Sequence, residues 1–549
     1  MSLNEINNRK LLWYAIPAII FYSALYFFRG MPFTDDSFIG YRYAVNWASG
    51  YGPVYNVGEY VEGFTDPLRI ALLAAGVYFS LDPVNFAPLL NLFVGVICFF
   101  LISYLCGFIS FSSPRLMAVI LPLFCAFSYG FYYHSATGMD TAQFSLGLLL
   151  CIVSLYRSKN TADYLSAIPF LALLNIIRAD GFIYGSILLI VLTVFIFLEN
   201  RKIPRKLLLT IAVFTCWTAT LFIIRYNIFN EWVPTTIISK AYASFEIKKA
   251  VFDGDFQALK RFIWVIFRGI QYVSPLFFVG AWIPFIVLLR DKDKKNDLLL
   301  WLFASLIAIN VIVSIWAGGD YFFHNRFNVQ VLPMVIIFTA WSIDLLIKKY
   351  WDNSFRNKVL MTGLIILIFS SWIVFFVKPS FFVKKYGAVK GVLYRQEIGM
   401  LLRDTPVATI LLTDMAGIVP YYAGSRVYVR DLYGFTDLHN AKYGNVWCIP
   451  EREISGICGR GDFNYSYSAP FDIIIYGSNT ILRELLSFCK THPTTCNEYQ
   501  FLMKDEWLRE EIFVVASINH PVTKTLINKF NLTPLTVNND LFNIIDKYR

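Results

Sequence analysis

Two adjacent aspartates, Asp35 and Asp36, are the residues whose type and spacing most directly suggest chemistry. They follow the first hydrophobic run of the chain. A carboxylate in such a place can take a proton from a hydroxyl group as a general base. The pair can also bind a divalent cation such as Mg²⁺, Mn²⁺ or Ca²⁺. Alone the pair is a weak signal, because two acids beside a hydrophobic run most often belong to a solvated loop.

Other ionisable residues recur in the polar turns between hydrophobic runs, on the same side as the pair. Placing charge at a membrane edge is costly, so these positions are informative. Arginine suits bidentate contact with phosphate. We expect Arg326, Arg178, Lys240 and His324 to bind a phosphate group, that of a phosphate-linked donor substrate. We expect substrate binding or support from Arg42, Glu62, Asp140, Asp180 and Asp320.

Simpler roles stay open for several of these side chains. Asp140 and Asp180 could each cap the N-terminus of a helix. Glu62 could orient either Arg42 or Lys240, and the sequence does not decide between them.

The composition requires a lipid bilayer around much of the chain. Of the 549 residues 57% are hydrophobic and only 16% are charged, with a mean hydropathy of +0.53. A soluble domain has about 25% charged residues. The net charge of +10 resides largely in short loops between apolar runs, where basic residues set membrane topology. We therefore expect a membrane protein with no nucleic-acid partner.

Eleven apolar runs are long enough to cross a bilayer. They fall near residues 11–28, 86–111, 116–133, 141–156, 162–177, 182–198, 207–226, 265–289, 298–316, 327–347 and 359–377. The first has no cleavage site after it, so we expect it to be retained. A further run, 67–80, is short, and counting it as a span would put basic loops on both sides of the membrane. The positive-inside rule therefore predicts a helix on the outer membrane surface for 67–80.

This topology predicts two domains. Residues 1–377 form the transmembrane part, with a cytoplasmic N-terminus and an outer loop, 29–85, that carries the aspartate pair. Residues 378–549 form a periplasmic tail in which strand and helix patterns alternate. The expected fold is an α-helical polytopic membrane protein of about eleven transmembrane helices with a C-terminal periplasmic α/β domain. The expected strands are 407–413, 427–431, 471–476 and 511–516, with a helix over 481–489.

The tail also holds four cysteines. An even number of cysteines outside the cytoplasm suggests disulfides. Close spacing favours Cys448–Cys458 and Cys489–Cys496, although the sequence does not fix the pairing.

Acids and phosphate-binding cations at an outer membrane face suit sugar transfer from a polyprenyl-phosphate carrier. A carboxylate would deprotonate an acceptor hydroxyl, which attacks the anomeric carbon as the lipid phosphate leaves, and one such displacement inverts that centre. A non-catalytic transporter or flippase of a lipid-linked sugar or polysaccharide is the alternative. Transporters commonly show internal repeats and charges in mid-membrane, and this sequence shows no repeat. Transfer of another lipid-phosphate headgroup would favour a His-rich metal site, and only five histidines are scattered along the chain.

Several segments, in order, resemble GT-C glycosyltransferases, closest to the terminal arabinofuranosyltransferase group. The first is 34–68, with the aspartate pair, an Arg-Tyr helix and the segment Val61-Glu-Gly-Phe-Thr-Asp-Pro-Leu68. Modest departures from the family pattern occur at Asn56-Val-Gly-Glu59, Phe64, Asp66 and Arg69. Further matching segments are Thr137-Gly-Met-Asp140, Arg178-Ala-Asp-Gly181, Pro234-Thr-Thr with Lys240, Gly318-Gly-Asp320, Arg326 with Pro333, Thr413-Asp-Met-Ala-Gly417, Pro420-Tyr-Tyr-Ala-Gly424 and Asp431-Leu-Tyr-Gly434.

This resemblance implies a GT-C fold with an outward catalytic cavity and a polyprenyl-phosphate sugar as donor. It implies that either Asp35 or Asp36 is the catalytic base. It does not specify the sugar. A lipopolysaccharide, an O-antigen or another cell-envelope glycan or glycolipid is at least as plausible an acceptor as an arabinan. We expect the protein to lie in a bacterial cytoplasmic (inner) membrane.

Overall fold

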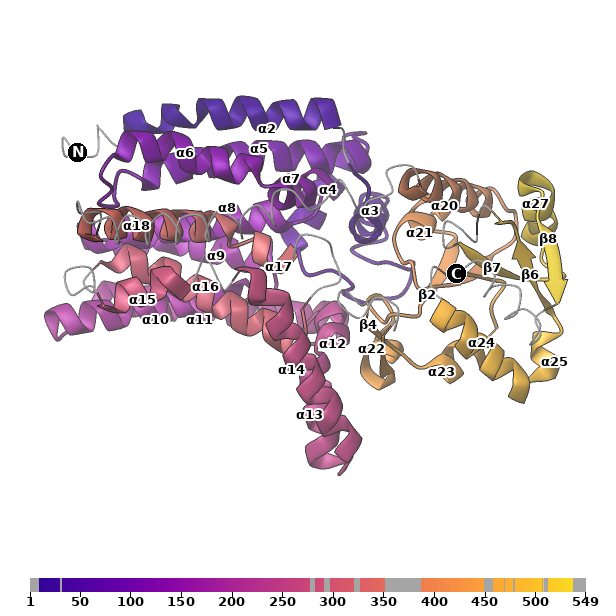
Figure 1. Cartoon of the computed structure of the whole chain (residues 1–549). Helices are drawn as coiled ribbons and strands as arrows, with labels where there is room; N and C mark the ends of the chain where they lie inside the picture. Colours follow the sequence, from indigo (N-terminus) through magenta and orange to yellow (C-terminus); the bar gives the residue numbers. More distant parts are fainter. Residues whose placement is uncertain are drawn as a thin grey trace.

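The computed structural model describes residues 9–29, 32–276, 282–290, 297–319, 326–350, 387–448, 458–468, 470–476, 479–505, 507 and 512–536. The first part of the chain forms a bundle of long helices, and a smaller α/β domain sits at one end of it (Figure 1). The first described α-helix, α2 (Ile16–Arg29), begins at the opposite end of the bundle from this domain (Figure 1). The two ends of the bundle therefore differ, because only one of them carries the α/β domain.

Six helical segments within these residues are long and apolar enough to cross a membrane. They are Arg9–Phe28 (η1, Leu12–Ala15, with α2, Ile16–Arg29), α5 (Pro83–Leu105), α8 (Thr141–Thr161), α10 (Gly181–Asn200), α11 (Arg205–Phe229) and α16 (Leu298–Trp316). A seventh is possible if α6 (Pro114–Phe127) and α7 (Tyr129–Ala136), which meet at a 60° bend, form one broken span. The polytopic helical bundle is thus confirmed.

Three further predicted spans each correspond to a pair of helices that does not meet this criterion among the described residues, which leave out 277–281. They are η2 (Tyr164–Ala167) with α9 (Ile168–Ile177), α14 (Phe256–Leu276) with α15 (Trp282–Arg290), and α17 (Arg326–Val329) with α18 (Leu332–Tyr350). The predicted span 359–377 lies outside the described residues. The count of eleven therefore stays a prediction.

The short run near 67–80 forms α4 (Pro67–Tyr78), which begins at a proline, as helices often do. Twelve residues rise about 18 Å, which is too short for a bilayer core of about 30 Å. α4 pairs with α3 (Asp35–Ala48) at the end of the bundle nearest the C-terminal domain (Figure 1). Two more helices, α12 (Thr235–Lys240) and α13 (Tyr242–Phe252), follow α11 at this end.

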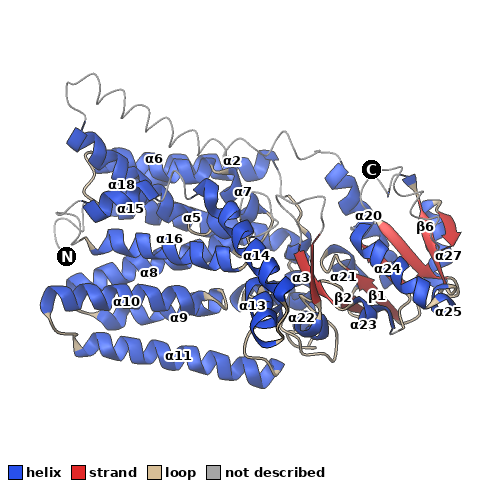
Figure 2. Ribbon diagram, turned by 60° about the horizontal axis from the view of Figure 1, so that its bottom comes forward, coloured by secondary structure: helices blue, strands red, loops and turns tan. Residues whose placement is uncertain are grey.

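The C-terminal domain is built on a six-stranded sheet in the order β2-β1-β5-β7-β6-β8. The strands are β1 (Thr409–Thr413), β2 (Val427–Asp431), β5 (Ile473–Tyr476), β6 (Tyr499–Met503), β7 (Phe513–Ser517) and β8 (Thr533–Thr536). β2, β1 and β5 are parallel and the other pairs antiparallel. Figure 2 shows the strands gathered in this domain. The four predicted strands are present, whereas β6, β8 and the small hairpin β3 (Asn445–Cys448) with β4 (Cys458–Gly461) were not predicted.

Helices surround this sheet. They are α20 (Gly387–Arg403), α21 (Ile418–Ala423), α22 (Leu438–Tyr443), α23 (Phe463–Ser468), α24 (Asn479–Thr491), α25 (Pro493–Cys496) and α27 (Pro521–Phe530). The predicted helix 481–489 lies within α24. An α/β domain after the bundle is therefore confirmed, and its periplasmic location stays a prediction.

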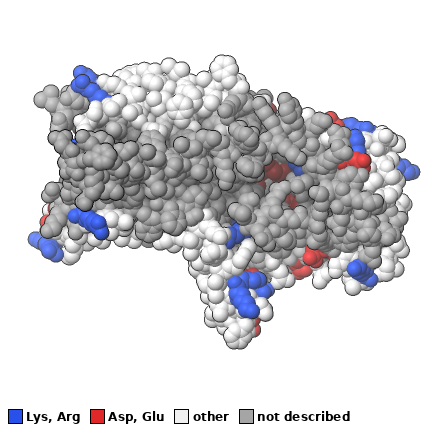
Figure 3. All heavy atoms as spheres, viewed as in Figure 1, with Lys and Arg blue, Asp and Glu red and all other residues white. Residues whose placement is uncertain are grey.

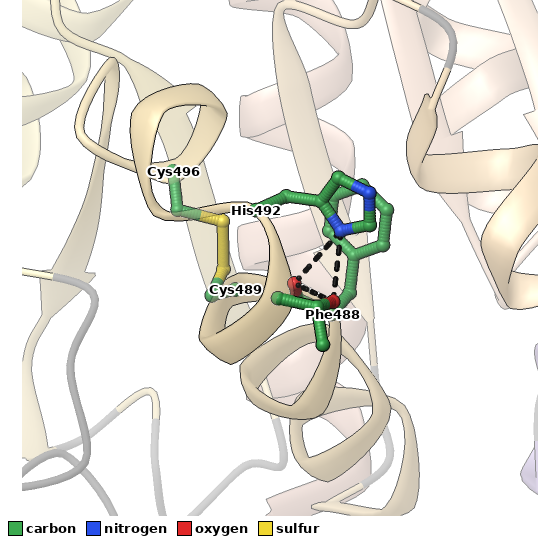
Figure 4. Close-up of a disulfide and its surroundings, with 5 residues drawn as sticks. Phe488, Cys489, His492 and Cys496 are labelled. Carbon is green, nitrogen blue, oxygen red and sulfur yellow. Dashed lines mark hydrogen bonds between the residues drawn. A yellow bond between two sulfur atoms is a disulfide. The ribbon is translucent and has the colours of Figure 1, made fainter.

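A disulfide joins Cys489 at the end of α24 to Cys496 in α25 (Figure 4). Between them the ring of His492 stacks on Phe488, with 4.2 Å between ring centroids. Cys448 and Cys458 lie opposite each other in the β3–β4 hairpin, but their side chains lie outside the described ones.

The charged side chains on one face of the molecule also differ between the two ends of the bundle. Figure 3 shows Lys and Arg side chains at the end of the bundle away from the C-terminal domain, and charges of both signs on the domain and near it. Six helical segments of the bundle, among the described residues, are apolar enough to cross a bilayer.

The domain is attached to the bundle through α3 and the loop that follows it. The buried guanidinium of Arg42 donates to the carbonyl oxygens of Tyr55 (2.8 Å), Gly424 (3.0 Å) and Val427 (2.7 Å), and to that of Pro420. The side-chain amide of Asn56 pairs with both backbone polar groups of Val429 in the edge strand β2. Arg42 thus docks the domain onto α3, and the substrate-binding or supporting role expected from the sequence stays a prediction.

We predict that Arg42→Met destabilises the protein by roughly 2–4 kcal/mol, because buried carbonyl oxygens lose a charged donor. Thermal unfolding in detergent measures the loss. Arg403→Met is the control, since Arg403 is half exposed and pairs with its exposed neighbour Asp404. Equal melting temperatures for the two variants would contradict this account of the docking.

Candidate active site

A cavity of about 540 Å³ lies where the bundle meets the C-terminal domain, and we call it the junction cavity. This volume is typical of a ligand pocket. Five separate polar segments contribute to its lining, namely the outer loop 29–85 and the segments 137–140, 178–181, 234–240 and 318–326. Six of the predicted site residues face it, namely Asp36, Asp140, Arg178, Asp180, Lys240 and Arg326.

The two aspartates of the pair have different surroundings. They begin α3, and adjacent residues of a helix point about 100° apart. The carboxylate of Asp35 accepts the backbone N–H groups of Gly417 (2.9 Å) and Ile418 (2.8 Å) in the C-terminal domain. Asp36 lines the cavity, and its carboxylate lies 3.3 Å from the guanidinium of Arg326. Asp35 therefore holds the domain while Asp36 is presented to a ligand.

Tight packing surrounds Asp35. A Cβ atom at Gly417 would lie 1.8 Å from the backbone oxygen of Asp35, so a larger residue would displace one of the two segments. Burial raises the pKa of Asp35 to about 6, against the opposing effects of the Ile418 N–H group and Arg395. The C-terminal domain thus fixes the first turn of α3 from one side.

Arg178 is the centre of a second charged cluster that lines the cavity. Its guanidinium donates to both carboxylate oxygens of Asp180 (3.0 and 2.9 Å) and lies 3.5 Å from Asp140. It also donates to the side-chain oxygen of Gln330 and lies over the ring of Phe144. Asp140 and Asp180 do occupy N-cap positions, but neither side chain makes a capping hydrogen bond. The capping alternative therefore does not account for their side chains.

The C-terminal domain contributes an aromatic wall beside Lys240. The Lys240 ammonium lies 4.8 Å from the ring centroid of Phe435, which stacks on Tyr433. Asp431 accepts the backbone N–H groups of Tyr433, Phe435 and Thr436 (2.7–2.9 Å), which fixes the loop that carries this ring. The tail segment 431–434 thus shapes the cavity indirectly, because Asp431 fixes the backbone of the loop that carries Phe435.

Glu62 does not bind Arg42 or Lys240, the two partners considered from the sequence. Its carboxylate accepts from Arg225 at 2.6 Å, and Arg225 lines the cavity near the end of α11. Burial raises the pKa of Glu62 to about 7, and Arg225 opposes this rise.

The geometry does not fit a cation shared by Asp35 and Asp36. Both oxygens of Asp35 are directed to backbone N–H groups, and a guanidinium lies against Asp36. Among the residues that the structure describes, no group of three or more His, Cys, Asp and Glu side chains could hold a metal ion. Asp320 and His324 lie outside those residues. We derive no step that involves a metal.

Some lining residues were missed at the level of sequence. Arg225 was included in the predicted span 207–226, although a charge inside an apolar run is itself a signal of function. Gln330 follows Arg326 by four residues, so that both fall on the same side of one helical turn. Phe435 carries no such signal, because its place depends on the fold of the tail.

No protein family matches the sequence, and no curated protein does. Solved structures do match. The oligosaccharyltransferase of Archaeoglobus fulgidus in its apo form has a TM-score of 0.54 and 11% identity, over 90% of this chain and 73% of that one. The AglB oligosaccharyltransferase from the same organism, in complex with an inhibitory peptide and a dolichol-phosphate, gives the same score and identity over 90% and 72%. ArnT from Cupriavidus metallidurans matches at a TM-score of 0.43 and 10% identity, over 87% and 93%.

At such low identity the likeness to the oligosaccharyltransferase concerns the fold. The chain shares its fold with that oligosaccharyltransferase, which agrees with the GT-C fold that the sequence resemblance implied. The closer resemblance to terminal arabinofuranosyltransferases stays a prediction.

We predict that Arg225→Gln destabilises the protein more at about pH 8 than at about pH 6. The folded pKa of Glu62, about 7, lies above its ordinary value of 4.5, so stability falls as the pH rises through this range. Arg225 offsets that cost, and its removal raises the pKa of Glu62 further. The penalty therefore grows above pH 7. Thermal unfolding at both pH values measures it.

The double variant Glu62→Gln, Arg225→Gln is the control, because no titrating carboxyl remains in that pair. Its stability should depend on pH less than that of Arg225→Gln. Equal destabilisation by Arg225→Gln at the two pH values would contradict the pairing.

Proposed function

We propose that this protein is a membrane glycosyltransferase that transfers a sugar from a polyprenyl-phosphate donor to a glycan or glycolipid acceptor. One observation carries the proposal: charged residues from five separate polar segments line one cavity at an end of an apolar helical bundle. Burying so many charges costs stability unless they are paired. Their convergence is most simply explained by a charged ligand.

Asp36 is the proposed general base. It faces the cavity, whereas the carboxylate oxygens of Asp35 are engaged by the C-terminal domain. In the reaction Asp36 takes the proton of an acceptor hydroxyl. The hydroxyl oxygen forms a bond to the anomeric carbon, and the bond from that carbon to the donor phosphate breaks with both electrons going to the phosphate. A single displacement inverts the anomeric centre.

The cations of the cavity are the proposed phosphate ligands. Arg326 and Lys240 line it together with Arg178. A phosphate carries the same sign of charge as the carboxylates that Arg326 and Arg178 contact in this structure. It can therefore replace a carboxylate as the partner of a guanidinium with little change in the local charge. As the phosphate leaves, these cations stabilise its added negative charge.

The lipid chain of the donor has an apolar path along the same cavity. Phe182, Phe222, Ile312 and Trp316 line it on α10, α11 and α16. Ile312 and Trp316 are 61% and 44% exposed although they line the cavity, so this side of it is open. A polyprenyl chain there would remain in contact with lipid while its phosphate reaches the charged wall.

The likeness to AglB supports a donor of this type, since that protein was solved with a dolichol-phosphate. The proposal places the cavity and the C-terminal domain on the outer, periplasmic face of a bacterial cytoplasmic membrane. Basic loops at the other end of the bundle support that orientation.

We predict that Asp36→Asn lowers transfer from a synthetic polyprenyl-phosphate sugar by about 10²–10⁴-fold, the usual contribution of general base catalysis. Its melting temperature should fall less than that of Asp35→Asn, because the amide oxygen of an asparagine at position 36 can still accept from Arg326. Asp35→Asn should lower the melting temperature, because an amide cannot accept both N–H groups. Turnover by the purified protein in proteoliposomes measures the first effect.

Asp163→Asn, at an exposed turn at the other end of α8, is the activity control. Full transfer activity in Asp36→Asn would rule out Asp36 as the base. Movement of the lipid-linked sugar across the membrane without product would favour a transporter instead.

A further inference from the structure

Helices α13 and α14 form a lobe that projects sideways from the bundle, which we call the lateral lobe (residues 242–276). Figure 1 shows it extending away from the long helices at the end that faces the C-terminal domain. It begins two residues after Lys240, a wall residue of the junction cavity.

One face of α14 carries a continuous apolar stripe. Its members recur every three or four residues, which places them on one side of the helix. They are between 41% and 83% exposed. The stripe consists of Phe256, Leu259, Ile263, Phe267 and Ile270.

The opposite face of the lobe is packed against the rest of the protein. A Cβ atom at Gly269 would lie 2.4 Å from the backbone oxygen of Ile315 in α16. The Trp316 indole N–H donates to the hydroxyl of Ser244 in α13 at 2.8 Å. Arg261 pairs with Glu246 at 2.8 Å, which joins the two helices. These contacts hold the lobe in place, so that the stripe on the other side of α14 faces away from the protein.

The position of the lobe identifies what covers the stripe. α14 packs on the last turns of α16, a segment long and apolar enough to cross a membrane, so the lobe leaves the bundle where that span ends. Ile312 and Trp316 on α16 are exposed and continue the apolar surface from the span toward the lobe. The lobe also carries five basic residues against three acidic ones. Among them, Lys248 and Lys260 are exposed.

We propose that the lateral lobe lies on the bilayer, with the apolar stripe of α14 inserted among the lipid chains and its lysines beside anionic headgroups. Helices with a large apolar face and basic flanks lie in the interface in this way. This inference does not depend on the proposed reaction, because it rests on the bundle crossing a membrane. It assigns residues 265–276, the first half of the predicted span 265–289, to the membrane surface instead. Its consequence is that the bilayer holds the segment leading from Lys240.

Photocrosslinking of the full chain in proteoliposomes tests the proposal. The photoreactive residue p-benzoylphenylalanine replaces Ile263 or Phe267, and mass spectrometry counts lipid adducts after irradiation. The control is the same replacement at Ile518, a 45% exposed residue that follows β7 in the C-terminal domain. We expect about tenfold more lipid adducts at the two stripe positions than at Ile518.

Lipid adducts no more frequent at the stripe than at Ile518 would overturn the proposal. So would crosslinks at Ile263 and Phe267 to a second copy of this chain, which would assign the stripe to a contact between copies. In mixed vesicles we expect adducts with phosphatidylglycerol to exceed those with phosphatidylcholine, and Lys248→Gln with Lys260→Gln to reduce that excess. Equal labelling of the two lipids would overturn the assignment of the lysines to anionic headgroups.

Discussion

The first turn of α3 is held from two sides, and the rest of the site depends on this arrangement. On one side the carboxylate of Asp35 accepts two backbone N–H groups of the C-terminal domain. On the other side Asp36 meets Arg326 of the bundle. Because neighbouring residues of a helix diverge by about 100°, one Asp-Asp dipeptide can serve both contacts at once. The bundle, the domain and the cavity between them thus meet at two consecutive carboxylates.

The electrostatics of the junction cavity follow from pairing. An isolated charge in so closed a place is expensive, whereas a paired and hydrogen-bonded one is tolerated. Arg178 lies among two carboxylates and an amide, Arg225 meets Glu62, and Arg326 meets Asp36. The same pairs keep the cations in place for an incoming anion. In this account the acids of the site have two tasks, since they stabilise the empty cavity and one of them accepts a proton.

The sequence predicted the parts of this structure that depend on local patterns. Long apolar runs predicted the six helical segments that are long and apolar enough to cross a membrane. The short run at 67–80 predicted α4 through the charges of the neighbouring loops, and alternating patterns predicted four strands of the sheet. The convergence of Asp140, Arg178, Lys240 and Arg326 followed from placing their turns on one side. What the sequence could not separate were the roles of Asp35 and Asp36, because that requires the knowledge that both lie in a helix. The hydrogen bonds of Arg42 were not predicted for a related reason: three of its four partners are carbonyl groups about 380 residues away, and carbonyl groups leave no mark in a sequence.

The most direct test of the account is an electron cryomicroscopy map of the protein in lipid nanodiscs with a polyprenyl phosphate bound. The account predicts phosphate density in the junction cavity, within about 3 Å of the guanidinium of Arg326 or the ammonium of Lys240, with the carboxylate of Asp36 beside it. The lipid chain should run along α16 past Trp316. Phosphate density at the opposite end of the bundle, among the basic residues that precede α11, would contradict the account.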